Sequence, residues 1–368
     1  MTALIRSRLT DWTLVVPLIA VLVLVATWGR ALPGVLVAVV AALLAGAVLA
    51  AVHHAEVVAH KVGEPFGSLV LAVAVTVIEV ALIVTLMISG GDKTQALARD
   101  TVFAAVMITC NGILGLSLLI GALRRRLAVF NPEGTGGALA TVATLATLSL
   151  VVPTFTTSRP GPEFSPPQLA FAAVASLALY GLFVLVQTGR HRDYFLPVNQ
   201  EGRLVDADGD GHADPPSTRT ALASLALLIV ALVAVVGDAK TISPAIEAGV
   251  SAANLPQAFV GVVIALLVLL PETLAAARAA RQDRVQISLN LALGSAMASI
   301  GLTIPAIALA SIWLKGPLLL GLGGTQLTLL ALTAVAGVLT VVPGRATVLQ
   351  GGVHLVLLAA FVFLAASP

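Results

Sequence analysis

Apolar residues follow one another in long continuous runs along most of this chain, for example from Leu14 to Thr27 and from Ala221 to Val236. A helix needs about 20 mostly apolar residues to cross a membrane, whereas a membrane β-strand alternates polar and apolar side chains. Charged residues make up only 10% of the 368 residues, against about a quarter in soluble domains. The sequence therefore predicts an all-α polytopic membrane protein and excludes a soluble enzyme, a secreted scaffold and a disordered chain.

The length of the runs predicts about eleven membrane-spanning helices. The predicted spans are residues 13–30, 33–53, 66–90, 100–123, 136–157, 167–189, 218–237, 257–277, 285–313, 318–342 and 347–366. Two more polar stretches, 54–64 and 241–256, are expected either to lie at the interface or to extend a helix beyond the membrane.

The basic residues predict an orientation. With a cytoplasmic N-terminus, the inside segments hold 14 of the 20 Lys and Arg residues, in accord with the excess of positive charge on cytoplasmic loops. We therefore expect a multi-pass protein of the inner (plasma) membrane whose C-terminus is external. Because the basic residues are scattered through short loops, the partners expected are the lipid bilayer and small ions, with no nucleic acid.

Two acidic residues lie inside the predicted spans rather than in loops. Glu79 lies among apolar residues in the third span, and Glu272 follows Leu270 and Pro271 in the eighth. A charged side chain at bilayer depth costs at least ~2.5 kcal/mol, so a chain that carries two such groups is expected to use them.

The surroundings of the two acids indicate an internal repeat. Each acid follows an amphipathic stretch and a possible helix break, at 63–65 before Glu79 and at 254–256 before Glu272. The acids are five spans apart, and an odd offset makes the copies cross the membrane in opposite directions, as in secondary transporters. The predicted organisation is an N-terminal transmembrane helix (1–32), a first repeat of five helices (33–189), a cytoplasmic acidic loop (190–217) and a second, inverted repeat of five helices (218–368).

Paired carboxylates in a dry cavity can act as exchange groups. They cannot both stay ionised without a counter-charge, so they either take protons or share a cation, and the two states exclude each other. Ca²⁺ takes about six to eight oxygen ligands, so neutral oxygens must complete its shell. The predicted metal ligands are Glu79 and Glu272, and the predicted cation and proton site adds Asn111, Ser295 and Ser299.

A few further polar residues lie near the mouths of the two repeats. Glu64, Glu56, His54 and Glu247 are expected either to line a vestibule or to be ordinary interfacial groups. The loop at 190–217 contains residues 206–211, which match the first half of a calcium-binding EF-hand loop. Ser217 stands where that loop needs a bidentate Glu, so a solvated linker is expected, or a segment that attracts cations.

The residues around the two acids resemble a known family. The segment His54-Ala-Glu-Val-Val-Ala-His-Lys-Val-Gly-Glu-Pro-Phe-Gly-Ser-Leu69, running on to Val-Thr-Val-Ile-Glu79, is similar to the first repeat of the bacterial Cha-type calcium/proton antiporters. The segments Leu270-Pro-Glu-Thr-Leu-Ala-Ala-Ala-Arg278 and Leu291-Ala-Leu-Gly-Ser-Ala-Met-Ala-Ser-Ile-Gly-Leu-Thr303 are similar to the second. The resemblance implies a member of the calcium/cation antiporter superfamily, an inner-membrane protein that exports Ca²⁺, and in some members Na⁺ or K⁺, in exchange for protons.

Residues and resemblance together predict a secondary active transporter working by alternating access. Its expected cargo is a cation, most favourably Ca²⁺, exchanged for protons, with no resident cofactor. The first alternative is a monovalent Na⁺ or K⁺/proton antiporter on the same scaffold. The alternative from another class is a cation channel, which would not require protons to be exchanged. The sequence shows no motif typical of an enzyme.

Overall fold

The computed structural model describes residues 2–30, 32–63, 66–198, 216–314 and 316–368. Within these ranges the chain is helical, apart from loops and one pair of two-residue antiparallel strands, β1 (Ala128–Val129) and β2 (Arg345–Ala346). The chain divides into two compact units, which are described separately. Unit 1 comprises Met1–Thr94 and His212–Val260, and unit 2 comprises Gln95–Gly211 and Gly261–Pro368.

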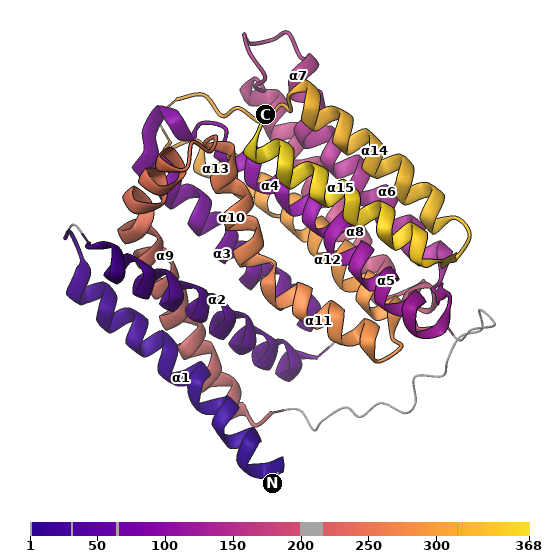
Figure 1. Ribbon diagram of the computed structural model, residues 1–368, viewed down its shortest axis with the longest axis horizontal. Coiled ribbons are helices and arrows are strands. Elements are labelled where there is room, and N and C mark those ends of the chain that lie inside the picture. Colours follow the sequence, from indigo (N-terminus) through magenta and orange to yellow (C-terminus); the bar gives the residue numbers. More distant parts are fainter. Residues whose placement is uncertain (1, 31, 64–65, 199–215, 315) are drawn as a thin grey trace. The chain divides into compact units, whose positions relative to one another are not determined.

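Unit 1 is a bundle of long helices, to which both of its chain segments contribute. It contains α1 (Thr2–Thr27), α2 (Gly34–Val62), α3 (Phe66–Gly90), the short 3₁₀ helix η1 (Gly91–Thr94) and α9 (Thr218–Ala252). α9 packs against α1, α2 and α3, and α2 packs against both α1 and α3 (Figure 1). Two glycines bring these helices close: a Cβ at Gly46 would lie 2.8 Å from Val16, and Gly237 has no room for a Cβ beside Leu24.

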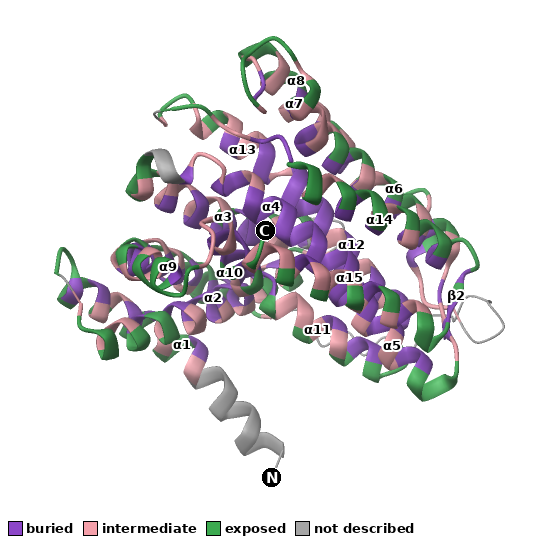
Figure 2. Cartoon of the chain, turned by 45° about the horizontal axis from the view of Figure 1, so that its top comes forward, coloured by how far each residue is buried: buried purple, intermediate pink, exposed green. Residues whose placement is uncertain are grey.

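Unit 2 is built around one deeply buried helical rod. The rod runs through α4 (Leu97–Met107), the π-helix η2 (Ile108–Ile113) and α5 (Leu114–Arg125), and Figure 2 shows buried positions gathered on α4 and on the neighbouring α12. The other elements of the unit are α6 (Pro132–Ala146), the π-helix η3 (Thr147–Val151), α7 (Val152–Phe155), α8 (Pro166–Thr188), η4 (Arg192–Phe195), α11 (Leu270–Arg281), α12 (Val285–Gly301), α13 (Thr303–Ala310), α14 (Gly324–Val341) and α15 (Val348–Ala366). α10 (Ala258–Val268) begins in unit 1 and continues into unit 2.

The fold class predicted from the sequence is confirmed. Over the described residues, nine helices are long and apolar enough to cross a membrane, and the bent pair α10–α11 makes ten. The predicted total of eleven would also need α1, whose described apolar part, Trp12–Thr27, is shorter than a full span. The eleventh span therefore stays a prediction.

The helix breaks expected before each acid are present. α2 ends at Val62, where Gly63 adopts a φ of 76° and its N–H donates to Ala59 O at 3.0 Å. α9 ends at Ala252, followed by Asn254 at a φ of 53°. Gly and Asn are the residues that most readily take this left-handed conformation at a helix end, which is why the sequence marks both positions.

The structure shows that the two polar stretches are helical. Both 54–62 and 241–252 continue the preceding helix, so α2 has 29 residues and α9 has 35. Residues 257–277 were predicted to form one continuous span. The structure has two helices there, α10 and α11, bent by 52° at Leu269. Pro271 in the first turn of α11 explains the bend, since proline is suited to a helix start and cannot continue the hydrogen bonding of α10.

α5 and α15 cross in backbone contact at two glycines. A Cβ at Gly351 would lie 2.8 Å from Leu119 N and 3.0 Å from Gly115 O, whereas a Cβ at Gly352 would meet nothing within 4 Å. Small residues allow such close helix crossings in membranes. We expect Gly351→Ala to lower the free energy of unfolding by about 1–3 kcal/mol, the usual cost of overpacking, and Gly352→Ala to melt like the wild type. Thermal melting of the purified variants in detergent checks this, and equal melting temperatures would contradict the close crossing.

Candidate functional site

Glu79 lies in the interior of α3, far from either end. Thirteen residues precede it in the helix and eleven follow, so it lies about 20 Å from the first residue at ~1.5 Å per residue. Its side chain is 2% exposed, and it shares a buried face with Thr76, Ile83 and Leu86 at helical spacing. The side chain is therefore shielded from its surroundings, and a carboxylate in such a place is costly unless it binds a proton or a cation.

Glu272 occupies a different local position, the first turn of a helix. The bend at Leu269 separates the helices α10 and α11. Next to it, Thr273 Oγ1 donates a hydrogen bond to Leu269 O at 2.7 Å. The free N–H groups of a helix start and its dipole stabilise negative charge, typically by ~0.3–1 kcal/mol. Glu272 is half-buried, so this carboxylate is better accommodated as an anion than one in a helix interior.

Asn111 is completely buried in η2 and held by two neighbouring helices. Its Nδ2 donates to Thr333 Oγ1 on α14 at 2.9 Å, and its Oδ1 lies 3.0 Å from His354 Nδ1 on α15. His354 Nε2 in turn lies 3.2 Å from Thr340 Oγ1. Because the Oδ1 of Asn111 accepts from His354, the histidine fixes the orientation of the amide, and Asn111 belongs to a polar network that runs from η2 to α14 and α15.

Ser295 and Ser299 are four residues apart on α12 and so share a face of that helix. Ser299 is buried and Ser295 is half-buried. α12 packs against η2, and η2 also packs against α11. The structure thus brings together the elements that carry Glu272, Asn111 and these two serines within unit 2, while Glu79 belongs to unit 1.

The predicted vestibule residues fall in three different settings. His54 is buried, and its Nε2 lies 3.0 Å from Thr13 O on α1, so it is part of the helix packing of unit 1. Glu56 is exposed on α2. Glu247 on α9 is half-buried and accepts a hydrogen bond from Ser243 Oγ at 3.4 Å. Glu64 lies outside the described residues, as does the EF-hand-like segment 206–211.

Sequence reasoning missed two buried acids. Asp238 on α9 is fully buried, one residue beyond the predicted end of the seventh span. Asp100 on α4 is also buried, paired with Arg99 at 2.8 Å and accepting from Gln326 Nε2 at 3.4 Å. The signal for Asp238 was available, since apolar residues at helical spacing continue past it to Val250. Asp100 is the first residue of the predicted span 100–123, and its contact with Gln326, far away in the chain, could not be read from the sequence.

Charge on the surface of unit 2 is arranged around the turn between α11 and α12. Asp283 accepts a hydrogen bond from Arg125 at 2.9 Å and lies 3.5 Å from Arg124. The hydrogen bond from Arg125, with the charges of both arginines, holds the pKa of Asp283 below its usual value. Within the described residues, no group of three or more His, Cys, Asp or Glu side chains is placed to hold a metal ion.

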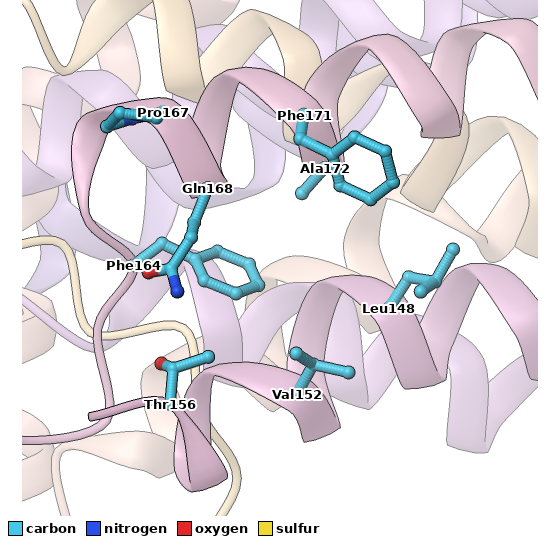
Figure 3. Close-up of a pocket in the computed structure, with 8 residues that line it drawn as sticks. All are labelled: Leu148, Val152, Thr156, Phe164, Pro167, Gln168, Phe171 and Ala172. Atoms are coloured by element: carbon cyan, nitrogen blue, oxygen red, sulfur yellow. The ribbon is translucent and has the colours of Figure 1, made fainter. Parts of the chain in front are cut away.

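A pocket of unit 2 is unsuited to ions. It has a volume of about 270 Å³ and is lined by η3, α7 and the start of α8. Figure 3 shows Phe164, Gln168 and Phe171 lying opposite Leu148 and Val152, with no acidic side chain among the labelled residues. Such a lining fits apolar groups, so the candidate ion-binding residues lie elsewhere in the fold.

Acidic side chains inside membrane-length helices, together with broken helices beside them, define an ion-transporting membrane protein. The sequence profile of the family described as "Sodium/calcium exchanger protein" matches residues 32–189 and 223–366. The chain belongs to this family, within the calcium/cation antiporter superfamily.

Individual relatives agree with this assignment. The chain is 34% identical over 361 residues to the sodium-potassium/proton antiporter ChaA of Escherichia coli (strain K12), covering 97% of this chain and 96% of that protein. It is 46% identical over 364 residues to protein y4hA of Sinorhizobium fredii (strain NBRC 101917 / NGR234), with the same coverage. Its fold is similar to that of YfkE (TM-score 0.71, 15% identity, 98% of this chain and 99% of that chain) and of the H⁺/Ca²⁺ exchanger CAX (TM-score 0.68, 16% identity, 98% and 92%).

Proposed function

We propose that this protein is a cation/proton antiporter in which Glu79 and Glu272 each bind either a proton or the transported cation. The observation that carries the proposal is the burial of Glu79 in the interior of a membrane-length helix. A carboxylate there is neutralised by a proton or by a cation, and replacing one by the other is the elementary step of exchange.

We propose Ca²⁺ as the principal cargo, with Asn111, Ser295 and Ser299 contributing neutral oxygens. Two carboxylates match the charge of one divalent cation, and oxygen-only ligands suit a hard ion. The similarity to the fold of the H⁺/Ca²⁺ exchanger CAX supports this reading. The relationship to the sodium-potassium/proton antiporter ChaA favours the second candidate, exchange of Na⁺ or K⁺ for protons on the same scaffold.

The decisive experiment uses purified protein in vesicles with an imposed pH gradient. We expect uptake of Ca²⁺ that stops when the pH gradient is collapsed. Parallel assays with Na⁺ and K⁺ compare exchange of these ions with exchange of Ca²⁺. Cation flux that does not depend on the proton gradient would instead indicate a cation channel, the alternative from another class that the sequence left open.

The orientation of the chain is a separate proposal. We place the protein in the bacterial inner membrane with a cytoplasmic N-terminus, a cytoplasmic 190–217 loop and an external C-terminus, and we propose the five-plus-five repeat organisation with limits 33–189 and 218–368. The excess of Lys and Arg on the inside segments supports this orientation.

Single cysteines introduced at Thr2, Asp208 and Pro368 test the orientation and the number of spans. In a Cys110→Ser background, a membrane-impermeant thiol reagent should label Thr2→Cys and Asp208→Cys from the cytoplasmic side and Pro368→Cys from the outside. The Cys110→Ser protein without an introduced cysteine gives the background, and the native Cys110 that it replaces is buried. Labelling of the two termini from the same side would mean that α1 does not cross the membrane and would reduce the spans to ten.

A further inference from the structure

Asp238 on α9 is an acidic side chain that the exchange mechanism above does not use. It has no exposed surface, and neither carboxylate oxygen has a hydrogen-bond partner among the described residues. An ionised carboxylate in such a place would lack both hydration and a counter-charge. The neutral acid avoids that cost, so a proton is the ligand that this position accommodates.

Two threonine hydroxyls of this part of α9 and of the neighbouring last turn of α1 are committed elsewhere. Thr241, one turn further along α9, donates from Oγ1 to Gly237 O at 2.9 Å. Thr27, in the last turn of α1, donates from Oγ1 to Val23 O at 2.8 Å. Both hydroxyls therefore satisfy their own helix backbone and do not stabilise a charge on Asp238.

The nearest basic residue in the chain faces solvent or lipid headgroups. Lys240 is exposed, and its Nζ lies 5.2 Å from the centre of the Trp28 ring. Lys and Trp together are typical of the membrane–water interface. Asp238 is thus buried in the helix packing but lies within one helical turn of an exposed, charged side chain.

The helices packed against α9 contribute few titratable groups near this level. The described side chains of α1 contain none, and α3 contributes Glu79. Those of α2 and of α9 itself are His53, His54, Glu56, His60, Lys61, Arg219, Lys240 and Glu247. His54 contacts Thr13 of α1, whereas Gly237 packs against Leu24. Thr13 and Leu24 are eleven residues, about 16 Å, apart along α1. The titratable side chains of α2 around His54 therefore lie away from Asp238, which directly follows Gly237.

We propose that Asp238 is a proton-binding site of this protein, separate from the exchange carboxylates Glu79 and Glu272. The acid is protonated while α9 packs against α1, α2 and α3 as in this structure. When a movement of α9 admits water, the O–H bond breaks, the proton passes to water and the carboxylate becomes a solvated anion. The inference rests on the proposed function at one point, because alternating access supplies the movement of α9.

Proton binding at Asp238 is coupled to the packing of α9, so pH affects the transport cycle through this site. Because the packed arrangement holds one proton more than the hydrated arrangement, low pH favours packing of α9 and high pH favours its opening. The pH dependence of transport then includes one group that neither binds the cargo cation nor accounts for the protons exchanged at Glu79 and Glu272.

Infrared difference spectroscopy of purified protein tests the protonation directly. A carboxylic acid shows a C=O stretching band that a carboxylate lacks, so wild type minus Asp238→Asn at neutral pH should show one such band. Ser224→Ala, which changes a buried polar residue of the same helix, should show none. Absence of the band from the Asp238 difference spectrum would overturn the assignment, because it would mean that the acid is ionised.

The pH profile of transport tests the consequence. Asp238→Asn should still exchange cations for protons, but its pH profile should lose the contribution of one ionisable group on the alkaline side, because the amide cannot ionise. Ser224→Ala should keep the full profile, and identical profiles for wild type and Asp238→Asn would overturn the proposed role. Loss of cation binding in Asp238→Asn would also overturn it, by making Asp238 a cargo ligand. If the wild type shows no exchange, the proposed function fails, while the infrared band still decides whether Asp238 binds a proton.

Discussion

Replacing Glu79 by glutamine is expected to remove most proton-driven cation uptake while leaving a folded, membrane-inserted protein. Glutamine keeps the size and hydrogen-bonding capacity of the side chain but cannot exchange a proton for a cation. A neutral amide is also less costly than a carboxylate inside the membrane, so stability should be kept or improved. We expect flux to fall at least tenfold, about 1.4 kcal/mol or more in the coupled step, measured as Ca²⁺ and Na⁺ uptake into everted vesicles under a pH gradient.

A matched substitution separates this effect from a general loss of negative charge. Glu133 is exposed in the first turn of α6, and Glu133→Gln makes the same chemical change at the protein surface. Its transport should equal that of the wild type, with both variants compared at equal amounts of membrane-inserted protein. Near-normal exchange by the Glu79 variant would refute the role proposed for this acid.

The depth of Glu79 could be predicted from the sequence because it depends on local information. Mostly apolar residues surround it for more than two turns on each side, and a helix with that pattern has few alternatives in a membrane. The breaks after α2 and α9 were predictable for the same reason, since Gly63 and Asn254 are residues that end helices.

The error at Asp238 shows where a hydropathy rule fails. A run of polar residues, including Lys240 and Thr241, ends the apolar stretch, so the predicted span stops at residue 237. The helix nevertheless continues to Ala252, because one of its faces stays apolar and buried at Val235, Ile242 and Val250. Packing against α1, α2 and α3 stabilises the helix there, and average hydropathy does not record which face a residue is on.

The surroundings of Asn111 could not be predicted from the sequence at all. Its partners Thr333 and His354 lie more than two hundred residues away in the chain. The π-helical turn at Ile108–Ile113 also depends on this packing, because an inserted residue in a helix is costly unless tertiary contacts stabilise it. His354, which the sequence presents as one polar residue in an apolar span, is in the structure the group that orients the Asn111 amide.

The second large effect is expected at Glu272. Glu272→Gln should also reduce proton-driven uptake at least tenfold, because the amide at the start of α11 cannot alternate between proton and cation. The helix start stabilises the anion, so the loss should appear mainly as weaker cation binding, measured by the cation concentration that gives half-maximal uptake. Glu247→Gln on α9 should be milder, because Glu247 lies outside the proposed exchange site, near the end of α9.

Combining the two substitutions tests whether the acids act on the same ion. Residues that act as a unit are strongly non-additive, so removing the second adds little once the first is gone. We therefore expect Glu79→Gln/Glu272→Gln to transport no more slowly than either single variant. If each single variant keeps partial exchange and the double variant shows the product of the two losses, the carboxylates work independently, and the charge-matching argument for Ca²⁺ gives way to exchange of one monovalent cation at each acid.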